Sequence, residues 1–263
     1  MNDSLNNGSA TNGPAIKFSN VSYRLETGYD LLRSLNLEVL RGETLVLLGR
    51  SGSGKTTSLK LINRLLEQSE GEIHVDGRSV RDWDVIRLRR MIGYVIQEIG
   101  LFPHFTVARN IGVVPQIEGW SSERIQQRVQ ELLQLVGLES QLASRYPREL
   151  SGGQRQRVGV ARALAADPSF LLMDEPFGAL DPITRAELQR EFLALQQRLE
   201  KTVVFVTHDL REALALGTRI ALMEAGQLVA THTPDEFLHS SNPLVAAYVD
   251  AFKTSPGCRD ESK

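Results

Sequence analysis

The chain has 263 residues, enough for one large domain or two small ones, and its 30 Lys and Arg against 32 Asp and Glu give a net charge of -2. Nucleic-acid binding usually needs a basic surplus, so no nucleic-acid partner is expected. The single cysteine, Cys258, excludes a disulfide framework and a cysteine-ligated metal site, which fits a cytoplasmic protein. The apolar runs are much shorter than the ~20 residues that cross a bilayer.

The N-terminal part predicts a tail followed by strands. Residues 1–14, rich in Asn, Gly and Ser, are expected to form a disordered tail. Strands are predicted over 16–25 and 35–48, with a turn at 41–43, and the apolar run 44–48 suits a strand that is buried on both faces. The alternating segment 72–77 ends in Asp-Gly, which is typical of a hairpin.

The middle of the chain predicts helices and the last third predicts alternating strands and helices. A stripe of apolar residues over 121–136 indicates an amphipathic helix that ends at Gly137, within a mostly helical insertion at about 98–165. Strands are then predicted at 169–174, 202–207 and 219–223. Helices are predicted at 182–199, capped by Asp181, and at 234–239, with a capping box from Thr233 and Glu236. This alternation predicts an α/β fold with a parallel sheet.

The segment GRSGSGKTT directly follows the buried strand and precedes a helix, which is the context of a phosphate-binding P-loop. Its glycines let several backbone N–H groups converge on phosphate oxygens, while Lys55 reaches the β- and γ-phosphates and Thr56 binds Mg²⁺. A plain strand–turn–helix connection is the alternative, and the number of matched positions makes it the poorer one. The residues expected to contact ATP here are Gly49, Arg50, Ser51, Gly52, Ser53, Gly54, Lys55, Thr56 and Thr57.

Two further strands end in polar residues that suit nucleotide hydrolysis. Asp174 stands at the tip of an apolar strand, where it can hold Mg²⁺ through water, and Glu175 is the natural general base for the attacking water. His208 ends the apolar run 203–207 and can donate to the γ-phosphate. Taken singly, Asp174 and Glu175 would by default be ordinary loop carboxylates, and a surface position would be an equally good interpretation of His208. The P-loop favours the catalytic interpretation.

A second glycine-rich helix start, LSGGQ, offers another anion site. The Ser151 hydroxyl and the N–H groups of Gly152 and Gly153 can bind a γ-phosphate. If the two loops lie on separate subdomains, this phosphate belongs to a second copy of the chain. The sequence therefore predicts a two-fold homodimer that closes in the presence of ATP, with loop 151–153 of one protomer covering the ATP bound by the other.

Four motifs occur along about 16–250 in a fixed order: the P-loop, LSGGQ, the apolar strand that ends in Asp-Glu, and the downstream strand-end His. This order resembles that of the nucleotide-binding subunit of an ABC transporter. The resemblance implies a P-loop ATPase core with an antiparallel β subdomain and a helical subdomain whose groove receives a permease helix near 101–107. It also implies that Gln97 contacts Mg²⁺ and the attacking water, that Gln154 belongs to the signature, and that Asp181 crosses the dimer interface. Leu25 stands where the family has an aromatic residue that stacks on adenine, and Tyr23 or Tyr29 is expected to replace it.

The stretch 89–120 resembles the ATPases of osmoprotectant importers, so the resemblance implies an ATPase that energises uptake of glycine betaine, choline, proline betaine or a related solute. Another small solute, or a soluble ABC ATPase acting on ribosomes or DNA, is the alternative. The expected partners are permease subunits and, indirectly, a solute-binding protein, which would hold the chain at the inner face of the membrane. The expected ATPase domain covers 15–250, followed by a tail at 251–263 in place of the CBS domains that some relatives carry.

Overall fold

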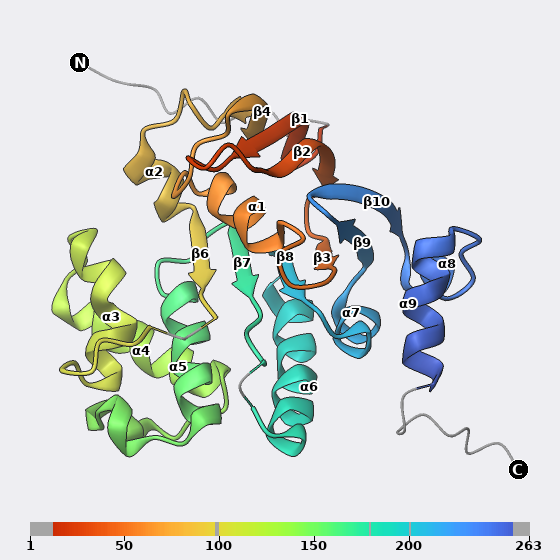
Figure 1. Ribbon diagram of the computed structural model, residues 1–263. Coiled ribbons are helices and arrows are strands. Elements are labelled where there is room, and N and C mark those ends of the chain that lie inside the picture. Colours follow the sequence, from red (N-terminus) through yellow and green to blue (C-terminus); the bar gives the residue numbers. More distant parts are fainter. Residues whose placement is uncertain (1–12, 98–99, 179, 200, 255–263) are drawn as a thin grey trace, which may run out of the picture.

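The computed structural model describes residues 13–97, 100–178, 180–199 and 201–254, and it arranges them as two sheets with helices between and around them (Figure 1). Most of the predicted N-terminal tail and Cys258 lie outside the described residues. No helix within these ranges is both long and apolar enough to cross a membrane.

The larger sheet has six strands in the order β10-β9-β3-β8-β7-β6, and all neighbours are parallel except the antiparallel edge pair β9 and β10. This confirms the predicted mostly parallel sheet. Its strands are β3 (Thr44–Leu48), β6 (Ile92–Val95), β7 (Phe170–Asp174), β8 (Thr202–Thr207), β9 (Arg219–Glu224) and β10 (Gln227–His232). The strands β3, β7 and β8 are buried along their whole length, as continuous apolar runs require.

The smaller sheet is antiparallel and lies at the top of Figure 1, in the order β2-β1-β4-β5. Its strands are β1 (Ile16–Arg24), β2 (Asp30–Val39), β4 (Glu70–Val75) and β5 (Arg78–Ser79). β2 starts five residues earlier than the predicted position 35. The sequence pattern misses these first residues because Ser34 adopts a positive φ of 45°, which breaks the alternation of buried and exposed side chains there. The predicted Asp-Gly turn is confirmed, since Asp76 and Gly77 have φ of 56° and 76°. The helix α1 (Lys55–Ile62) packs between the two sheets.

Helices fill most of 107–164, on the lower left of Figure 1. They are α3 (Val107–Ile117), α4 (Ser122–Leu135) and α5 (Gly152–Leu164), with 3₁₀ turns at Ser140–Ser144 and Pro147–Glu149, and α2 (Val85–Arg90) precedes β6. α4 begins at its Ser121 cap and Gly137, with φ of 66°, follows its end, as predicted. The buried side chains of these helices continue the apolar cluster below the six-stranded sheet, so helices and sheet share one core.

The last third contains α6 (Pro182–Leu199), α7 (Leu210–Leu216), α8 (Pro234–Leu238) and α9 (Pro243–Thr254). The predicted helix 182–199 is confirmed, and so is the capping box of α8. α9 runs to Thr254 and thus takes up the first residues of the segment expected to be a tail from 251 onward. Buried Val245 and Val249 attach α9 to the core.

Candidate active site

The candidate site lies where three neighbouring parallel strands end. β3 pairs with β8 through Leu48 and Thr207, and β8 pairs with β7 through Val206 and Asp174. The residues that follow these strands therefore lie along one edge of the sheet, and they include Gly49, Glu175 and His208. The carboxyl edge of a parallel sheet is where α/β proteins bind ligands.

The P-loop wraps around its own lysine. The Lys55 ammonium donates hydrogen bonds to the carbonyls of Gly49 and Arg50, both at 2.8 Å. Burial lowers the pKa of Lys55, an effect that nearby carboxylates, first Glu175, partly offset. Gly54 has φ of 97° at the start of α1, a conformation that favours glycine. The Ser53 hydroxyl is buried and lacks a hydrogen-bond partner among the described residues, which suits a donor that faces an anion.

Asp174 is held by two hydroxyl groups. Thr56 donates to its Oδ1 at 2.8 Å and Tyr94 to its Oδ2 at 3.4 Å. Burial raises the pKa of Asp174, while the Thr56 hydrogen bond acts in the opposite direction. Burial likewise raises the pKa of the Tyr94 hydroxyl. A hydroxyl and a carboxylate are the hard oxygen donors that suit Mg²⁺, a metal that usually takes its other ligands from phosphate and water. No group of three or more His, Cys, Asp or Glu side chains that could hold a metal ion occurs within the described ranges.

Gln97 follows β6 at the same edge, next to the strand that carries Asp174, and its side chain is exposed. Tyr94 was not predicted from the sequence. It occupies an inward position of an apolar strand, which by pattern alone is indistinguishable from an ordinary core aromatic.

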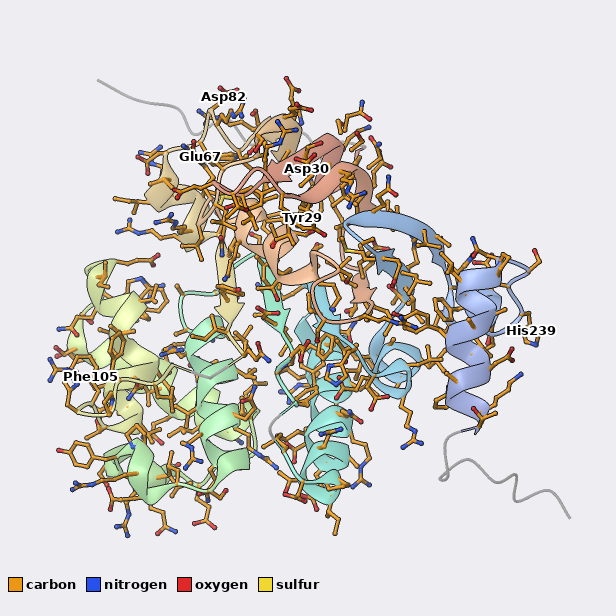
Figure 2. The ribbon with its side chains drawn as sticks, in the orientation of Figure 1. Tyr29, Asp30, Glu67, Asp82, Phe105 and His239 are labelled. Carbon is orange, nitrogen blue, oxygen red and sulfur yellow. The ribbon has the colours of Figure 1, made fainter. Side chains whose placement is uncertain are left out.

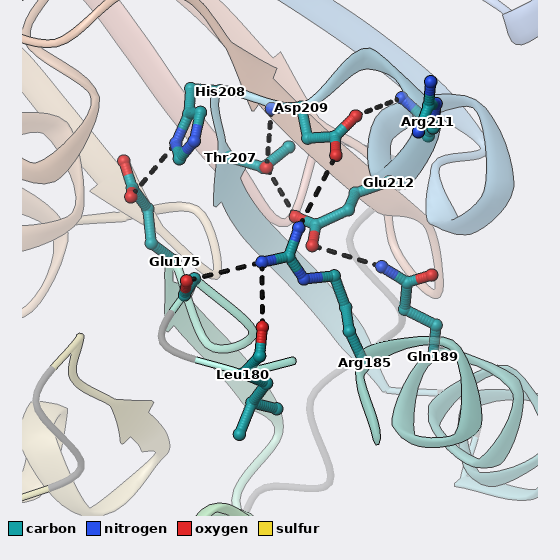
Figure 3. Close-up of polar contacts among 10 residues, drawn as sticks. Glu175, Leu180, Arg185, Gln189, Thr207, His208, Asp209, Arg211 and Glu212 are labelled. Atoms are coloured by element: carbon teal, nitrogen blue, oxygen red, sulfur yellow. Dashed lines mark hydrogen bonds and ion pairs between the residues drawn. The ribbon is translucent and has the colours of Figure 1, made fainter. Parts of the chain in front are cut away.

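Glu175 and His208 are brought together across 33 residues of sequence. His208 Nδ1 lies 3.2 Å from Glu175 Oε2 (Figure 3). The Glu175 N–H donates to the carbonyl of Val206 at 3.0 Å, so the backbone that carries the carboxylate is tied to β8. Glu175 has φ of 44°, in the left-handed region, which costs on the order of 1 kcal/mol for a non-glycine residue. Such strain, maintained by the surrounding fold, often marks functional residues.

The LSGGQ segment forms the start of α5. The Ser151 Oγ accepts a hydrogen bond from the Gln154 N–H at 3.2 Å, and the Gln154 Oε1 accepts from the Ser151 N–H at 2.9 Å. These two side chains therefore form a capping box and fix the helix start. A Cβ at Gly152 would have Leu180 as its nearest neighbour, at 3.7 Å, and one at Gly153 would meet Thr184 at 2.7 Å. The signature thus lies beside the beginning of α6 in its own chain.

Asp181 caps α6, because its Oδ1 accepts from the N–H groups of Ile183 and Thr184 at 3.1 and 3.0 Å. Its hydrogen bonds, chiefly those with Thr184, lower the pKa of this exposed carboxyl.

The three candidates for contact with adenine differ in exposure. The Tyr23 side chain, on β1, is half-buried and packs against the core between the sheets. Tyr29 is 54% exposed and Leu25 37% exposed, at the two ends of a turn in which the Leu25 N–H donates to the Tyr29 carbonyl at 2.9 Å. Figure 2 places Tyr29 next to Asp30, directly before the start of β2. Among these three side chains, Tyr29 is the aromatic ring with a free face.

Comparison with known proteins agrees with this arrangement. The sequence profile described as "ABC transporter" matches residues 32–178. The chain is 50% identical over 235 residues to the glycine betaine/carnitine/choline transport ATP-binding protein of Bacillus subtilis (strain 168), covering 89% of this chain and 62% of that protein. It is 54% identical over 219 residues to a glycine betaine uptake system ATP-binding protein of Escherichia coli (strain K12), covering 83% of this chain and 71% of that protein. The chain thus spans about three-fifths of the length of the first of these relatives.

A solved structure with the same fold is a dimeric ATP-binding cassette in a post-hydrolysis state, bound to ADP and Pi. Its TM-score is 0.75 at 35% identity, and the match covers 83% of this chain and 98% of that one. The profile match covers more than half of the chain, and the P-loop and the acidic strand end within it meet at one edge of the sheet. This chain therefore belongs to the ABC transporter family, as one of its ATP-binding proteins.

Proposed function

We propose that the chain hydrolyses ATP and acts as the motor subunit of an importer for small osmoprotectants such as glycine betaine, choline or proline betaine. The observation that carries the ATPase proposal is the meeting of Lys55, Thr56, Asp174, Glu175 and His208 at one sheet edge. The osmoprotectant class rests on the two relatives named above, whose names refer to glycine betaine, carnitine and choline.

Each residue of the site has a distinct task. The P-loop N–H groups and the Lys55 ammonium bind the phosphates. To do so, Lys55 gives up its hydrogen bonds to the loop carbonyls and forms hydrogen bonds to phosphate oxygens. Thr56 and Asp174 would hold Mg²⁺, which neutralises charge on the phosphate oxygens when it is bound. Gln97, at the same edge, is the further candidate ligand. Glu175 accepts the proton of the attacking water. His208 lies within hydrogen-bond distance of the Glu175 carboxylate, orients this carboxylate and donates a hydrogen bond to the γ-phosphate.

We further propose that two copies share the nucleotides. α5, which begins with the signature, packs on α3 and β6, whereas α1, which follows the P-loop, packs on β4, β7 and β8. A two-fold partner would bring its residues 151–153 to the nucleotide, with Asp181 at the interface. The dimeric cassette bound to ADP and Pi supports this assembly.

A groove between α2, β6, α3 and α5 is the proposed docking site for the permease. It has a volume of about 390 Å³ and is lined by Phe102, Ile117 and three arginines. The arginines also have contacts within the chain: Arg89 with the Asn63 carbonyl, Arg90 with Glu118 and Arg162 with the Gly100 carbonyl. Ile117 is 69% exposed, so its apolar side chain is accessible to a partner at this groove. An amphipathic permease helix with an acidic end fits this composition, and it would hold the chain at the inner face of the membrane.

The ATPase proposal is tested by phosphate release from the purified chain. We expect Lys55→Ala to abolish ATP hydrolysis, because the charge partner of the β- and γ-phosphates is lost. Lys17→Ala, which removes a lysine that pairs with Glu38 on the antiparallel sheet, is the matched control and should leave hydrolysis unchanged. Wild-type turnover in Lys55→Ala would contradict the P-loop assignment.

The importer proposal is tested by isolating the tagged chain from detergent-solubilised membranes and identifying its partners. A permease together with a receptor for quaternary amines is the expected result. A different permease would keep the motor role and exclude the osmoprotectant class. Ribosomal or DNA-repair proteins in place of any membrane protein would contradict the transporter role.

A further inference from the structure

A partly buried polar cluster behind the site connects the two segments that carry Glu175 and His208 (Figure 3). Its centre is Arg185, in the first turn of α6. The Arg185 Nη2 donates to the carbonyls of Leu180 at 3.1 Å and Gly178 at 3.4 Å, so the side chain folds back onto the connection between β7 and its own helix. The Gly178 N–H in turn donates to the Glu175 carbonyl at 3.2 Å. Arg185 therefore contacts the carbonyl of a residue whose own N–H is hydrogen-bonded to the backbone of the proposed base.

The other arm of the guanidinium reaches the histidine turn. Arg185 Nη1 lies 3.9 Å from Oδ2 of Asp209, the residue after His208. Asp209 is itself fixed, because its N–H donates to Thr207 Oγ1 at 3.0 Å and its Oδ1 accepts from the Arg211 N–H at 2.8 Å. One planar side chain thus joins the connection after β7 to the turn after β8.

Glu212 supports this arrangement from behind. The side chain is only 4% exposed, and its carboxylate accepts from Thr207 Oγ1 at 2.5 Å and from Gln189 Nε2 at 3.1 Å. Burial raises the pKa of Glu212 and the nearby Asp209 carboxylate acts in the same direction, whereas the charge of Arg185 favours the ionised form. An ionised carboxylate in this position needs a cation nearby, and Arg185 provides it.

We propose that Arg185 is a positioning residue for ATP hydrolysis, which keeps Glu175 and His208 in register by bridging the carbonyls of Gly178 and Leu180 to Asp209. This inference rests on the proposed ATPase function. The bridge requires the forked geometry of a guanidinium, because an ammonium group is a single point charge that cannot serve both sides. A purely structural role, in which Arg185 only balances the buried Glu212, is the competing explanation.

A double-mutant comparison of the full chain separates these explanations. Arg185→Met removes both the bridge and the cation. In the double variant, Glu212→Gln also removes the carboxylate charge that Arg185 balanced, and the new glutamine can still hydrogen-bond Thr207 and Gln189. The measurements are thermal unfolding, steady-state ATP hydrolysis and hydrogen exchange in peptides covering 175–185 and 206–212. Arg190→Met, at an exposed position of the same helix, is the matched control and should resemble the wild type.

We expect Arg185→Met to lower kcat about tenfold and to leave the KM for ATP within about twofold, because Arg185 contacts Gly178, Leu180 and Asp209 and not the P-loop. Exchange should rise in both peptides. The double variant should recover thermal stability but not kcat. Arg185→Lys keeps the cation, so it should have the stability of the wild type and only part of its kcat. This lysine variant also replaces Arg185→Met in the comparison if the methionine variant does not fold.

Recovery of kcat together with stability in the double variant, or full kcat in Arg185→Lys, would overturn the positioning role. Failure of the wild type to hydrolyse ATP would instead contradict the proposed function. In that case unchanged hydrogen exchange in Arg185→Met would overturn the bridge, and increased exchange in both peptides would support it.

Discussion

Gly152→Ala separates the folding of the chain from the proposed contact across the dimer. A methyl group at this position has room in the single chain, since its nearest neighbours would be Leu180 Cδ2 at 3.7 Å and Arg155 Nη2 at 3.9 Å, which are ordinary van der Waals distances. Gly152 is the first residue of α5, and alanine has a higher helix propensity than glycine. The free energy of unfolding should therefore stay the same or rise slightly.

The same methyl group would project where the partner's γ-phosphate approaches the helix start. Displacing one backbone donor of an oxyanion site typically lowers turnover about 100-fold or more. We therefore expect Gly152→Ala to lose ATP hydrolysis and ATP-dependent dimerisation while its thermal unfolding midpoint is maintained. Light scattering with ATP and Mg²⁺, phosphate release and calorimetry of the nucleotide-free chain measure these three quantities.

Gly153→Ala provides the contrast, because its methyl group would lie 2.7 Å from Thr184 Cγ2 within the same chain and should lower stability as well. The reasoning would be refuted if Gly152→Ala hydrolysed ATP at the wild-type rate and dimerised normally. A large loss of stability in Gly152→Ala would refute the argument that the single chain has room for the methyl group.

The remaining predictions concern the nucleotide site. Glu175→Gln should bind ATP and accumulate as a closed dimer in light scattering, because the base is lost and the shape is kept; a monomer with ATP and Mg²⁺ present would count against the shared site. Tyr94→Phe removes a long hydrogen bond to Asp174 that is worth roughly 0.5–1 kcal/mol. The Mg²⁺ concentration that half-saturates ATP binding should therefore rise about two- to fivefold. An unchanged Mg²⁺ titration would show that this hydrogen bond has no role. The pKa of Asp174 is raised above its ordinary 3.8, so its contribution to the free energy of unfolding is present below that pH and is lost as the pH rises through the raised pKa. Asp174→Asn should therefore remove this part of the pH dependence in urea unfolding curves and abolish the effect of Mg²⁺ on ATP affinity, and an unaltered pH profile would contradict the assignment. Tyr29 has the more exposed ring, so Tyr29→Ala should weaken ATP binding with little loss of stability, whereas Tyr23→Ala should mainly lower stability. Equal ATP affinity of Tyr29→Ala and the wild type in a fluorescence titration would exclude the stacking role.

The sequence by itself determined the features that depend on neighbouring residues. The P-loop, the capping box at Thr233 and the turn at Asp76 are local, because each is formed by groups within a few residues of one another. The continuous apolar runs likewise indicated buried parallel strands, and polar residues directly after such strands must meet at one edge of the sheet. The positions of Asp174, Glu175 and His208 could therefore be anticipated without coordinates.

Only the tertiary structure decided which distant side chains touch. Tyr94 and Asp174 are 80 residues apart, and Arg185 reaches Asp209 from a different element, so no local pattern distinguishes them from a core aromatic and a surface arginine. The half-buried Tyr23 and the exposed Tyr29 are both tyrosines near the end of β1 and the start of β2, and only strand pairing sets their different exposure. The physical reason is that local sequence sets backbone preference, whereas the contacts and burial of a side chain follow from how whole elements pack.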